Sequence, residues 1–385
     1  MIPEGEDRAP IEARIGNSSS FSAKSGLSAG DPLADSDGPC RKALVNWASE
    51  VECLHGLADQ EGASNQSMEA AKSDTSVIPV IGYGPIGREV TRLLIERGLQ
   101  VRIVQRSAPA VVPEGATYVK ANVMEAEEVF DAIGGAGTIV LALGLPYSGK
   151  VWSEQWPIAM RSLLAACEKA GARMVYADSL YLYGPRSQPL HEGLPPVNYG
   201  LKPTARSEAT RLWQNAFAEG RVKTAAVRAP DFFGPGVETS ILGAPTLGRL
   251  AQGRSAQVLI SADYLHDIVH ITDFARAIVT LVEAPDEAFG EAWHVPTPPT
   301  KTLREAITIA ADAMGVPAKI SVVPGWLARL LAFIVPQIRE AMELHYLTDR
   351  PYIVDSTKFR ERFWSDVDPL EKSIAETAKT YLGSD

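Results

Sequence analysis

Short apolar segments alternate with amphipathic segments along the chain from residue 77 onward. The apolar segments that we expect to be buried strands are 77–81, 101–105, 119–123, 138–144, 173–177 and 224–228. Between them, apolar residues recur at helical spacing. Val90, Leu93 and Leu94, for instance, share one face of a helix that ends at Gly98. Because strands and helices alternate, the sequence predicts an α/β fold with a doubly wound parallel sheet.

The first 67 residues differ from the rest in charge and hydrophobicity. They contain 11 acidic and 5 basic residues, so −6 of the net charge of −10 lies in this segment. Low hydrophobicity with excess charge leaves too little apolar surface to offset the entropy of ordering, so we expect residues 1–72 to be a disordered N-terminal extension. The pattern fits neither a secretory signal nor a mitochondrial transit peptide. An alternative is that Met68 is the natural start.

Composition narrows the function classes. The hydrophobic fraction is 45%, yet no apolar run approaches the roughly 18 residues of a membrane span. The excess of 47 acidic over 37 basic residues disfavours nucleic acid and anionic membrane surfaces as partners. The cysteines, Cys40, Cys53 and Cys167, are too scattered for a disulfide scaffold or a zinc site. We therefore expect a cytoplasmic protein that binds a small molecule and no metal.

A glycine-rich turn follows the first predicted strand. Gly82-Tyr83-Gly84-Pro85-Ile86-Gly87 lies between a strand and a helix, the context in which G-x-G-x-x-G binds a dinucleotide. The first glycine permits a tight turn, the second lets the backbone approach the pyrophosphate, and the third lets the helix pack close to the strand. We assign Gly82, Gly84, Pro85, Ile86 and Gly87 to cofactor binding. Pro79 argues against this, because proline is unfavourable inside a central strand.

The end of the second strand indicates which dinucleotide binds. An NAD site has Asp or Glu about 20 residues after the glycines, whereas this chain has Gln105-Arg106-Ser107. A guanidinium and a hydroxyl suit a 2′-phosphate, so Arg106 favours NADP, with NAD as the alternative. Arg106 could instead be only a solvated surface residue. We expect Asn122, at the end of the third strand, near the adenine, and we assign Leu143 and Gly144 to the same cofactor.

Five landmarks, in order along the chain, carry a resemblance to a known family. They are Gly82–Gly87, Ser179–Gly184, Arg228–Pro235, His270–Ala277 and Trp293–Pro296. Residues from about 76 to 383 resemble the extended short-chain dehydrogenase/reductases, the NAD-dependent epimerase/dehydratase family, and look closest to an atypical subgroup. The resemblance implies a Rossmann-type domain over 73–235, with sheet additions from 260–296, and a mainly substrate-binding region over 236–385. It also implies a homodimer through helices near 157–170 and 203–219.

The catalytic signature of that family is altered here. The family places a Ser or Thr four residues before a Tyr-Gly pair to bind the substrate carbonyl, and Ser179 matches. Its Tyr-x-x-x-Lys motif supplies the tyrosine that exchanges a proton with the substrate oxygen and the lysine that lowers the tyrosine pKa. This chain reads Tyr199-Gly-Leu-Lys202-Pro203, with the lysine one position early. Because proline disfavours the helical conformation in the preceding residue, we expect Lys202 to lie ahead of the helix.

Several assignments therefore stay open. Tyr199 is the first candidate for the acid–base group and Tyr183 the second, Arg206 could replace the lysine, and a site without an acid–base tyrosine is a further alternative. The segment 230–235 resembles the family's loop beside the nicotinamide, or else it is an ordinary turn with two core phenylalanines. On the first interpretation Pro230 and Phe232 bind the cofactor, and Phe233 faces the substrate.

Two functions are compatible with these features. The first is an NAD(P)-dependent oxidoreductase or epimerase-type enzyme that transfers hydride to or from a small carbonyl or secondary alcohol. Trp152 and Trp156 would then line the substrate site. No clear basic cluster in the C-terminal half suits a second pyrophosphate, so a small, partly apolar substrate is preferred. The second function, motivated by the altered Tyr-x-x-x-Lys motif, is a non-catalytic NADP-binding sensor or scaffold.

Overall fold

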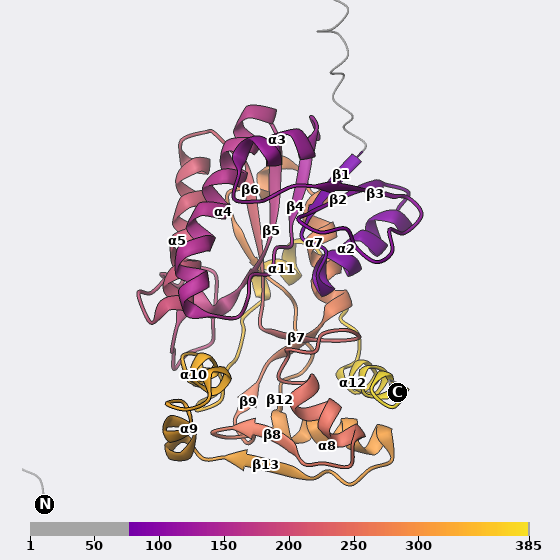
Figure 1. The fold of residues 1–385 in the computed structure, drawn as a ribbon, viewed down its shortest axis with the longest axis vertical. Coiled ribbons are helices and arrows are strands. Elements are labelled where there is room, and N and C mark those ends of the chain that lie inside the picture. Colours follow the sequence, from indigo (N-terminus) through magenta and orange to yellow (C-terminus); the bar gives the residue numbers. More distant parts are fainter. Residues whose placement is uncertain (1–76, 384–385) are drawn as a thin grey trace, which may run out of the picture. The chain divides into compact units, whose positions relative to one another are not determined.

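A seven-stranded parallel sheet forms the centre of the computed structural model, which describes residues 77–383 (Figure 1). Its strands are β1 (Val77–Ile81), β2 (Gln100–Gln105), β3 (Ala116–Lys120), β4 (Thr138–Leu141), β5 (Arg173–Ser179), β6 (Thr224–Ala229) and β11 (Ala292–His294). Their order is β11-β6-β5-β4-β1-β2-β3, so the direction of strand addition reverses between β1 and β4. The predicted doubly wound α/β fold is confirmed. The expectations for residues 1–72 and Met68 lie outside the described residues.

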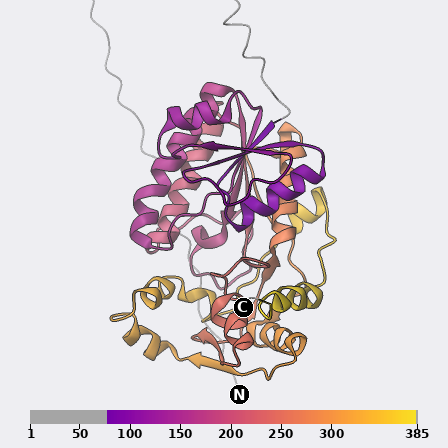
Figure 2. The same cartoon turned by 45° about the vertical axis from the view of Figure 1, so that its right-hand side comes forward.

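Helices cover both faces of this sheet. They are α2 (Pro85–Glu96), α3 (Ala126–Ile133), α4 (Gly149–Ala170), α5 (Leu201–Ala218) and α7 (Ile271–Glu283). On one face α2 packs with α7, and on the other α3, α4 and α5 pack together (Figure 2). Alternate residues of β1 enter the two cores, Val80 on the α2–α7 side and Ile81 on the other. Since both faces are buried at the centre of the sheet, strands such as β1 and β4 read as continuous apolar runs.

Two strands end earlier than the sequence predicts. β3 ends at Lys120, whereas the sequence predicted an end near residue 123. The prediction ran too far because Ala121 and Val123, which follow the strand, are also buried and prolong the apolar pattern. β4 ends at Leu141, and the chain then leaves the sheet before Gly144. Pro79 does lie inside β1, at a point where pairing with β4 has not yet begun.

The remaining described elements form a smaller region and connections to it. Three strand pairs are β7 (Asp231–Phe233) with β10 (Ile268–His270), β9 (Leu265–His266) with β12 (Lys301–Thr302), and β8 (Ala256–Leu259) with β13 (Ile320–Val323). The helices are α6 (Arg249–Ala251), α8 (Leu303–Met314), α9 (Gly325–Leu331), α10 (Pro336–Met342), α11 (Thr357–Arg362) and α12 (Leu370–Thr380). Single-turn helices are η1 (Leu180–Tyr183), η2 (Ala244–Gly248), η3 (Asp286–Ala288) and η4 (His345–Leu347).

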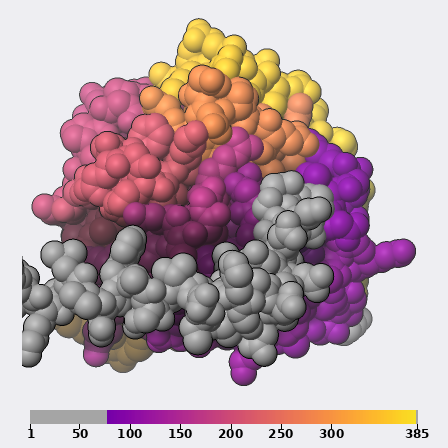
Figure 3. Space-filling model, turned by 90° about the horizontal axis from the view of Figure 1, so that it is seen from above, coloured from indigo at the N-terminus to yellow at the C-terminus, as the bar shows by residue number. Residues whose placement is uncertain are grey.

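Apolar side chains hold these parts together. A third core joins β8, α8 and α12 through residues such as Val258, Ile307 and Ile374. The edge strand β11 is covered by α11, where Trp293 and Phe359 meet edge to face with ring centroids 6.4 Å apart. Covering an edge strand protects its unpaired backbone groups. The C-terminal residues, yellow in Figure 3, lie at the surface beside the orange part of the chain.

Candidate active site

The glycine-rich turn connects β1 to α2 at the carboxyl edge of the sheet. Gly82 has φ +95°, and a Cβ atom there would lie 2.6 Å from the carbonyl oxygen of Ala142. A Cβ atom at Gly87 would lie 1.9 Å from the carbonyl oxygen of Gly82, whereas one at Gly84 would meet no atom within 4 Å. The first turn of α2, which starts at Pro85, has no side-chain cap. Its backbone N–H groups are therefore available to an anion.

A cavity of about 740 Å³ lies against this turn. Its walls come from the start of α2, from the segments that follow β4, β5 and β6, and from residues of the smaller region. The predicted site residues that line it are Gly84, Pro85, Ile86, Leu143, Gly144, Trp152, Ser179, Arg206, Pro230 and Phe232. Ligands of open α/β sheets bind where the strand order reverses, which is the position of this cavity.

Gly82 and Gly87 support the turn from behind the cavity lining, and two further residues predicted to contact the cofactor, Arg106 and Asn122, also lie apart from that lining. Arg106 is exposed just after β2. Its neighbour Gln105 is held in place, because its side chain accepts a hydrogen bond from the Tyr83 amide (3.2 Å) and donates one to the Ser107 carbonyl (2.6 Å). Asn122 lies in the loop after β3, where its side chain accepts a hydrogen bond from a backbone amide two residues on (3.2 Å).

Ser179, the last residue of β5, presents a polar atom to the cavity. Its Oγ is buried and has no hydrogen-bond partner among the described residues. Asp178 accepts the backbone N–H of Ser179 (2.8 Å) and pairs with the buried guanidiniums of Arg228 (3.0 Å) and Arg206 (3.4 Å). Arg206 also stacks on Trp156, 4.0 Å from the ring centroid. This network fixes Ser179 while leaving its hydroxyl free for a ligand.

Lys202 is buried in an ion-pair network and does not line the cavity. It is the second residue of α5, contrary to the expectation that proline would keep it out of the helix, and its side chain is fully buried. Its ammonium group donates to the Glu340 carboxylate, to the Glu340 carbonyl (3.0 Å) and to Glu343 Oε2 (2.9 Å). The other carboxylate oxygen of Glu343 accepts the backbone N–H groups of Leu201 and Lys202. These bonds offset the unfavourable conformation before Pro203, whose missing N–H is no loss in a first helical turn.

Neither tyrosine that the sequence nominated for proton transfer lines the cavity. Tyr199 precedes α5 and packs edge to face on Tyr346, and burial with the nearby Asp349 raises its pKa. The Tyr183 hydroxyl accepts from Arg228 (2.7 Å) and lies 3.0 Å from His294 Nε2, and burial raises its pKa. A proton donor needs a hydroxyl within reach of the substrate, so this geometry favours neither residue.

The two remaining predicted substrate contacts are core residues. Trp156 is fully buried among α4, α5 and the sheet, and Phe233 belongs to the core of the smaller region. Trp152 does line the cavity, and its Nε1 donates to the Pro146 carbonyl (2.9 Å). Both residues lie on the side of α4 that packs against the sheet, but only Trp152 reaches the cavity. A spacing of four residues does not show which of the two is at the cavity and which is in the core.

Several cavity residues were not anticipated from the sequence. Tyr147 and Tyr181 line it, and desolvation raises the pKa of each. Tyr181 stacks on Trp152 with ring centroids 6.2 Å apart. Asp231 and His345 also contribute to the wall. Tyr181 and Asp231 stand two residues after the ends of the neighbouring strands β5 and β6, so strand-end position was the signal available.

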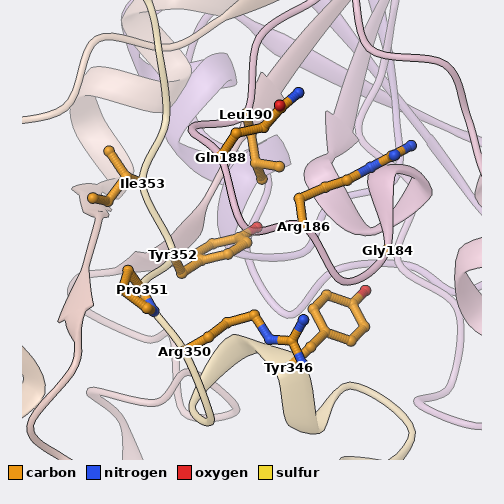
Figure 4. Close-up of a pocket in the computed structure, with 9 residues that line it drawn as sticks. All are labelled: Gly184, Arg186, Gln188, Leu190, Tyr346, Arg350, Pro351, Tyr352 and Ile353. Atoms are coloured by element: carbon orange, nitrogen blue, oxygen red, sulfur yellow. The ribbon is translucent and has the colours of Figure 1, made fainter. Parts of the chain in front are cut away.

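A second, much smaller pocket of about 10 Å³ lies among Gly184, Arg186, Tyr346, Arg350 and other residues (Figure 4). Arg186 donates to the carbonyls of Tyr183 (2.9 Å) and Pro195 (2.8 Å), and Arg350 binds Asp349 (2.7 Å). With room for about one water molecule and both guanidiniums engaged, this pocket suits structural water rather than a substrate.

The chain belongs to the NAD dependent epimerase/dehydratase family, whose model matches residues 78–295. Solved structures similar to it include UDP-glucose 4-epimerase from Thermus thermophilus in complex with NAD, with 19% identity and a TM-score of 0.65 over 80% of this chain and 100% of that one. DesIV, a dTDP-glucose 4,6-dehydratase from Streptomyces venezuelae with NAD bound, has 16% identity and a TM-score of 0.68 over 80% and 97% of the two chains. No curated protein matches.

The described range, residues 77–383, has neither a membrane-spanning helix nor a cluster of metal ligands. No helix in that range is long and apolar enough to cross a membrane. Nor does the range contain a group of three or more His, Cys, Asp and Glu side chains placed to hold a metal ion.

Proposed function

We propose that this protein is an NAD(P)-dependent oxidoreductase that transfers hydride to or from a small, partly apolar carbonyl or secondary alcohol. The observation that carries this proposal is that one cavity joins the glycine-rich turn, through Gly84, to the unpartnered hydroxyl of Ser179. A dinucleotide and a carbonyl substrate would therefore meet in the same cavity. When bound, the nicotinamide would supply or accept the hydride, and the protein would orient the substrate.

The residues around the turn suit a dinucleotide. Open space at Gly84 and the uncapped start of α2 can receive a pyrophosphate, and Leu143 and Gly144 line the same cavity. NADP is the preferred form in this proposal, because exposed Arg106 follows β2 where an NAD site carries a carboxylate. The similar epimerase and dehydratase structures hold NAD, which makes the preference a specific point to test.

The cavity favours a substrate with little charge. Most of its wall is apolar, and Arg206 is the only Lys or Arg among the residues that line it in the described chain. Three arginines of the C-terminal half, Arg249, Arg254 and Arg350, are the cations there that a second pyrophosphate would need, and they do not line the cavity. All three bind neighbouring groups: Arg249 donates to the Ser255 carbonyl, Arg254 to the Gln252 side chain and Arg350 to Asp349. A sugar nucleotide would leave its phosphates without a matching set of cations.

A titration with NADPH and with NADH, followed by nicotinamide fluorescence, tests the cofactor. We expect tighter binding of NADPH, and Arg106→Gln should raise its Kd about tenfold or more while changing that of NADH little. Arg161→Gln, which removes an exposed arginine of α4, is the matched control. Equal effects of the Arg106 change on both dinucleotides would contradict the NADP assignment, and no binding of either would overturn the enzyme proposal.

A non-catalytic, dinucleotide-binding sensor is the second candidate. It is favoured by one observation, the use of Lys202 in a buried ion-pair network rather than beside a cavity tyrosine. Turnover separates the two functions. Reduction of apolar aldehydes and ketones by NADPH that is lost in Ser179→Ala supports the enzyme, whereas tight binding without turnover supports the sensor.

We also propose a homodimer formed through α4 and α5. These helices carry exposed apolar side chains, Ile158 on the first and Leu201 and Phe217 on the second. Light scattering of the purified protein should give twice the mass of one chain, and Ile158→Glu should shift the equilibrium toward monomer.

A further inference from the structure

Asp231 and His266 meet at the wall of the large cavity. Asp231 is the first residue of β7 and lines the cavity, whereas His266, the last residue of β9, lies behind it and is 2% exposed. Asp231 Oδ2 and His266 Nε2 are 2.9 Å apart. The pair thus has one partner at the cavity and one in the interior, and it occupies none of the positions of the altered Tyr-x-x-x-Lys motif.

The hydrogen bonds of His266 imply a proton held between the two side chains. His266 Nδ1 lies 2.9 Å from the carbonyl oxygen of Leu347, which can only accept, so Nδ1 carries a hydrogen. If Nε2 were bare, its lone pair would face the carboxylate of Asp231 without a proton between them. Either the ring is an imidazolium beside a carboxylate, or it is neutral beside a carboxylic acid. Both forms store one exchangeable proton at the cavity wall.

The position of Asp231 also fits a shared site with Ser179. In the register of β5 and β6, Ser179 is opposite Ala229, and Asp231 follows two residues later. Both side chains therefore emerge at the same carboxyl edge and line the same cavity. A substrate oxygen held by Ser179 would lie in the space that Asp231 also faces.

We propose that Asp231, backed by His266, is the group that gives a proton to the substrate oxygen or takes it away. This assignment rests on the proposed oxidoreductase function. In reduction, the carbonyl carbon gains the hydride of a dihydronicotinamide with its electron pair, the C–O π electrons move to oxygen, and that oxygen takes the stored proton. The pair is then one proton short and regains it from water. Oxidation of the alcohol runs through the same steps in reverse.

The other ionisable groups near the pair are less suited to this role. Burial, together with the charge of Asp231, raises the pKa of Tyr147, Tyr181, Tyr346 and Tyr352, so these hydroxyls are weaker acids than a free tyrosine and give up a proton less readily at neutral pH. On the interior side, burial raises the pKa of Asp267, whose carboxylate accepts the backbone N–H of Val354 (2.7 Å). His345 also lines the cavity, but its Nδ1 lies 3.0 Å from the Met342 carbonyl oxygen and its Nε2 lies 3.5 Å from Asp349, whereas Asp231 and His266 form a pair that reaches the cavity through Asp231.

The variant Asp231→Asn tests the assignment with little change in shape. Its amide can donate to His266 Nε2, so the hydrogen bond survives while the stored proton is lost. Asp267→Asn is the matched control, because Asp267 is also buried in this region but does not line the cavity. We would measure NADPH binding, thermal stability and the pH profile of kcat with 9,10-phenanthrenequinone, an apolar dicarbonyl. Proton NMR with ¹⁵N-labelled histidine would report the bridging proton without turnover.

The expected results are a far-downfield exchangeable proton at His266 in the unaltered protein and its loss in Asp231→Asn. The same variant should bind NADPH normally, lower kcat about 100-fold or more and lose the ionisation from the pH profile, whereas Asp267→Asn should keep kcat within about threefold. A missing bridging proton, or an Asp231→Asn enzyme with an unchanged kcat and pH profile, would overturn the assignment. Absence of NADPH binding and turnover in the unaltered protein, with the bridging proton present, would refute the proposed function instead.

Discussion

Replacing Lys202 with methionine separates a structural lysine from a catalytic one. The side chain of Lys202 is fully buried, and its ammonium group pairs with Glu340 and Glu343, whose side chains are 23% and 17% exposed. Methionine keeps most of the volume and removes the charge. Two carboxylates then lose their common cation, at a place where water reaches them only partly.

The magnitude can be estimated from these contacts. Deleting one partner of a fully buried ion pair costs about 3–5 kcal/mol. Since both carboxylates keep some contact with water, we expect Lys202→Met to lower the free energy of unfolding by about 2–3 kcal/mol. Part of the effect should come from loosened helix starts, because Glu343 accepts N–H groups at the start of α5 and Glu340 accepts the Gly149 amide at the start of α4 (2.7 Å).

The loss should depend on pH in a defined direction. Burial alone would raise the pKa of Glu340, but hydrogen bonds from Lys202 and from the Gly149 amide lower it below its usual value. A carboxyl with a lowered folded-state pKa stabilises the protein above its unfolded-state pKa, and this stabilisation disappears as the pH falls through the folded-state value. The difference between the unaltered protein and Lys202→Met should therefore be full at pH 7 and shrink below about pH 4.

Urea unfolding at several pH values measures this difference, with Lys150→Met, an exposed lysine of the same neighbourhood, as the control. Lys202→Met combined with Glu340→Gln and Glu343→Gln should regain part of the loss, because no unpaired charge remains. The reasoning is refuted if Lys202→Met unfolds like the unaltered protein. It is refuted equally if the folded variant binds NADPH but loses turnover, since Lys202 would then act in catalysis.

Three more predictions test the site and its surroundings. Gly84→Ala should fold normally but weaken NADPH binding, whereas Gly87→Ala should also destabilise the fold because its Cβ would lie 1.9 Å from Gly82 O; melting temperatures and Kd values check both. Burial and the charge of Arg228 lower the pKa of His294 to about 3, so stability should fall by about 2 kcal/mol from pH 7 to 5 as the unfolded chain takes up a proton there; a flat urea series would contradict this. Tyr199→Phe should leave kcat within about twofold, and a larger loss would restore Tyr199 as the acid–base candidate.

Local patterns determined the fold class and the cofactor turn. Burial on both faces makes central strands such as β1 and β4 continuously apolar. The strand–turn–helix context identifies the glycine-rich turn, in which Gly82 and Gly87 meet backbone requirements and Gly84 leaves open space for a ligand. Family membership followed from the ordered landmarks. The loops after β4, β5 and β6 were also foreseeable as cavity wall, because the carboxyl ends of parallel strands share one edge.

The roles of particular polar side chains depended on partners distant in the sequence. Lys202 reads as half of an altered catalytic motif until Glu340 and Glu343, about 140 residues later, neutralise it in the interior. Asp231 reads as part of a turn until the fold brings His266 Nε2 to 2.9 Å from its carboxylate, with His266 Nδ1 on the carbonyl of Leu347. The sequence by itself therefore determined the sheet, the turn and the edge where the site lies. Only the tertiary structure decided which ionisable groups face the cavity, because burial and charge pairing arise from contacts that no local spacing encodes.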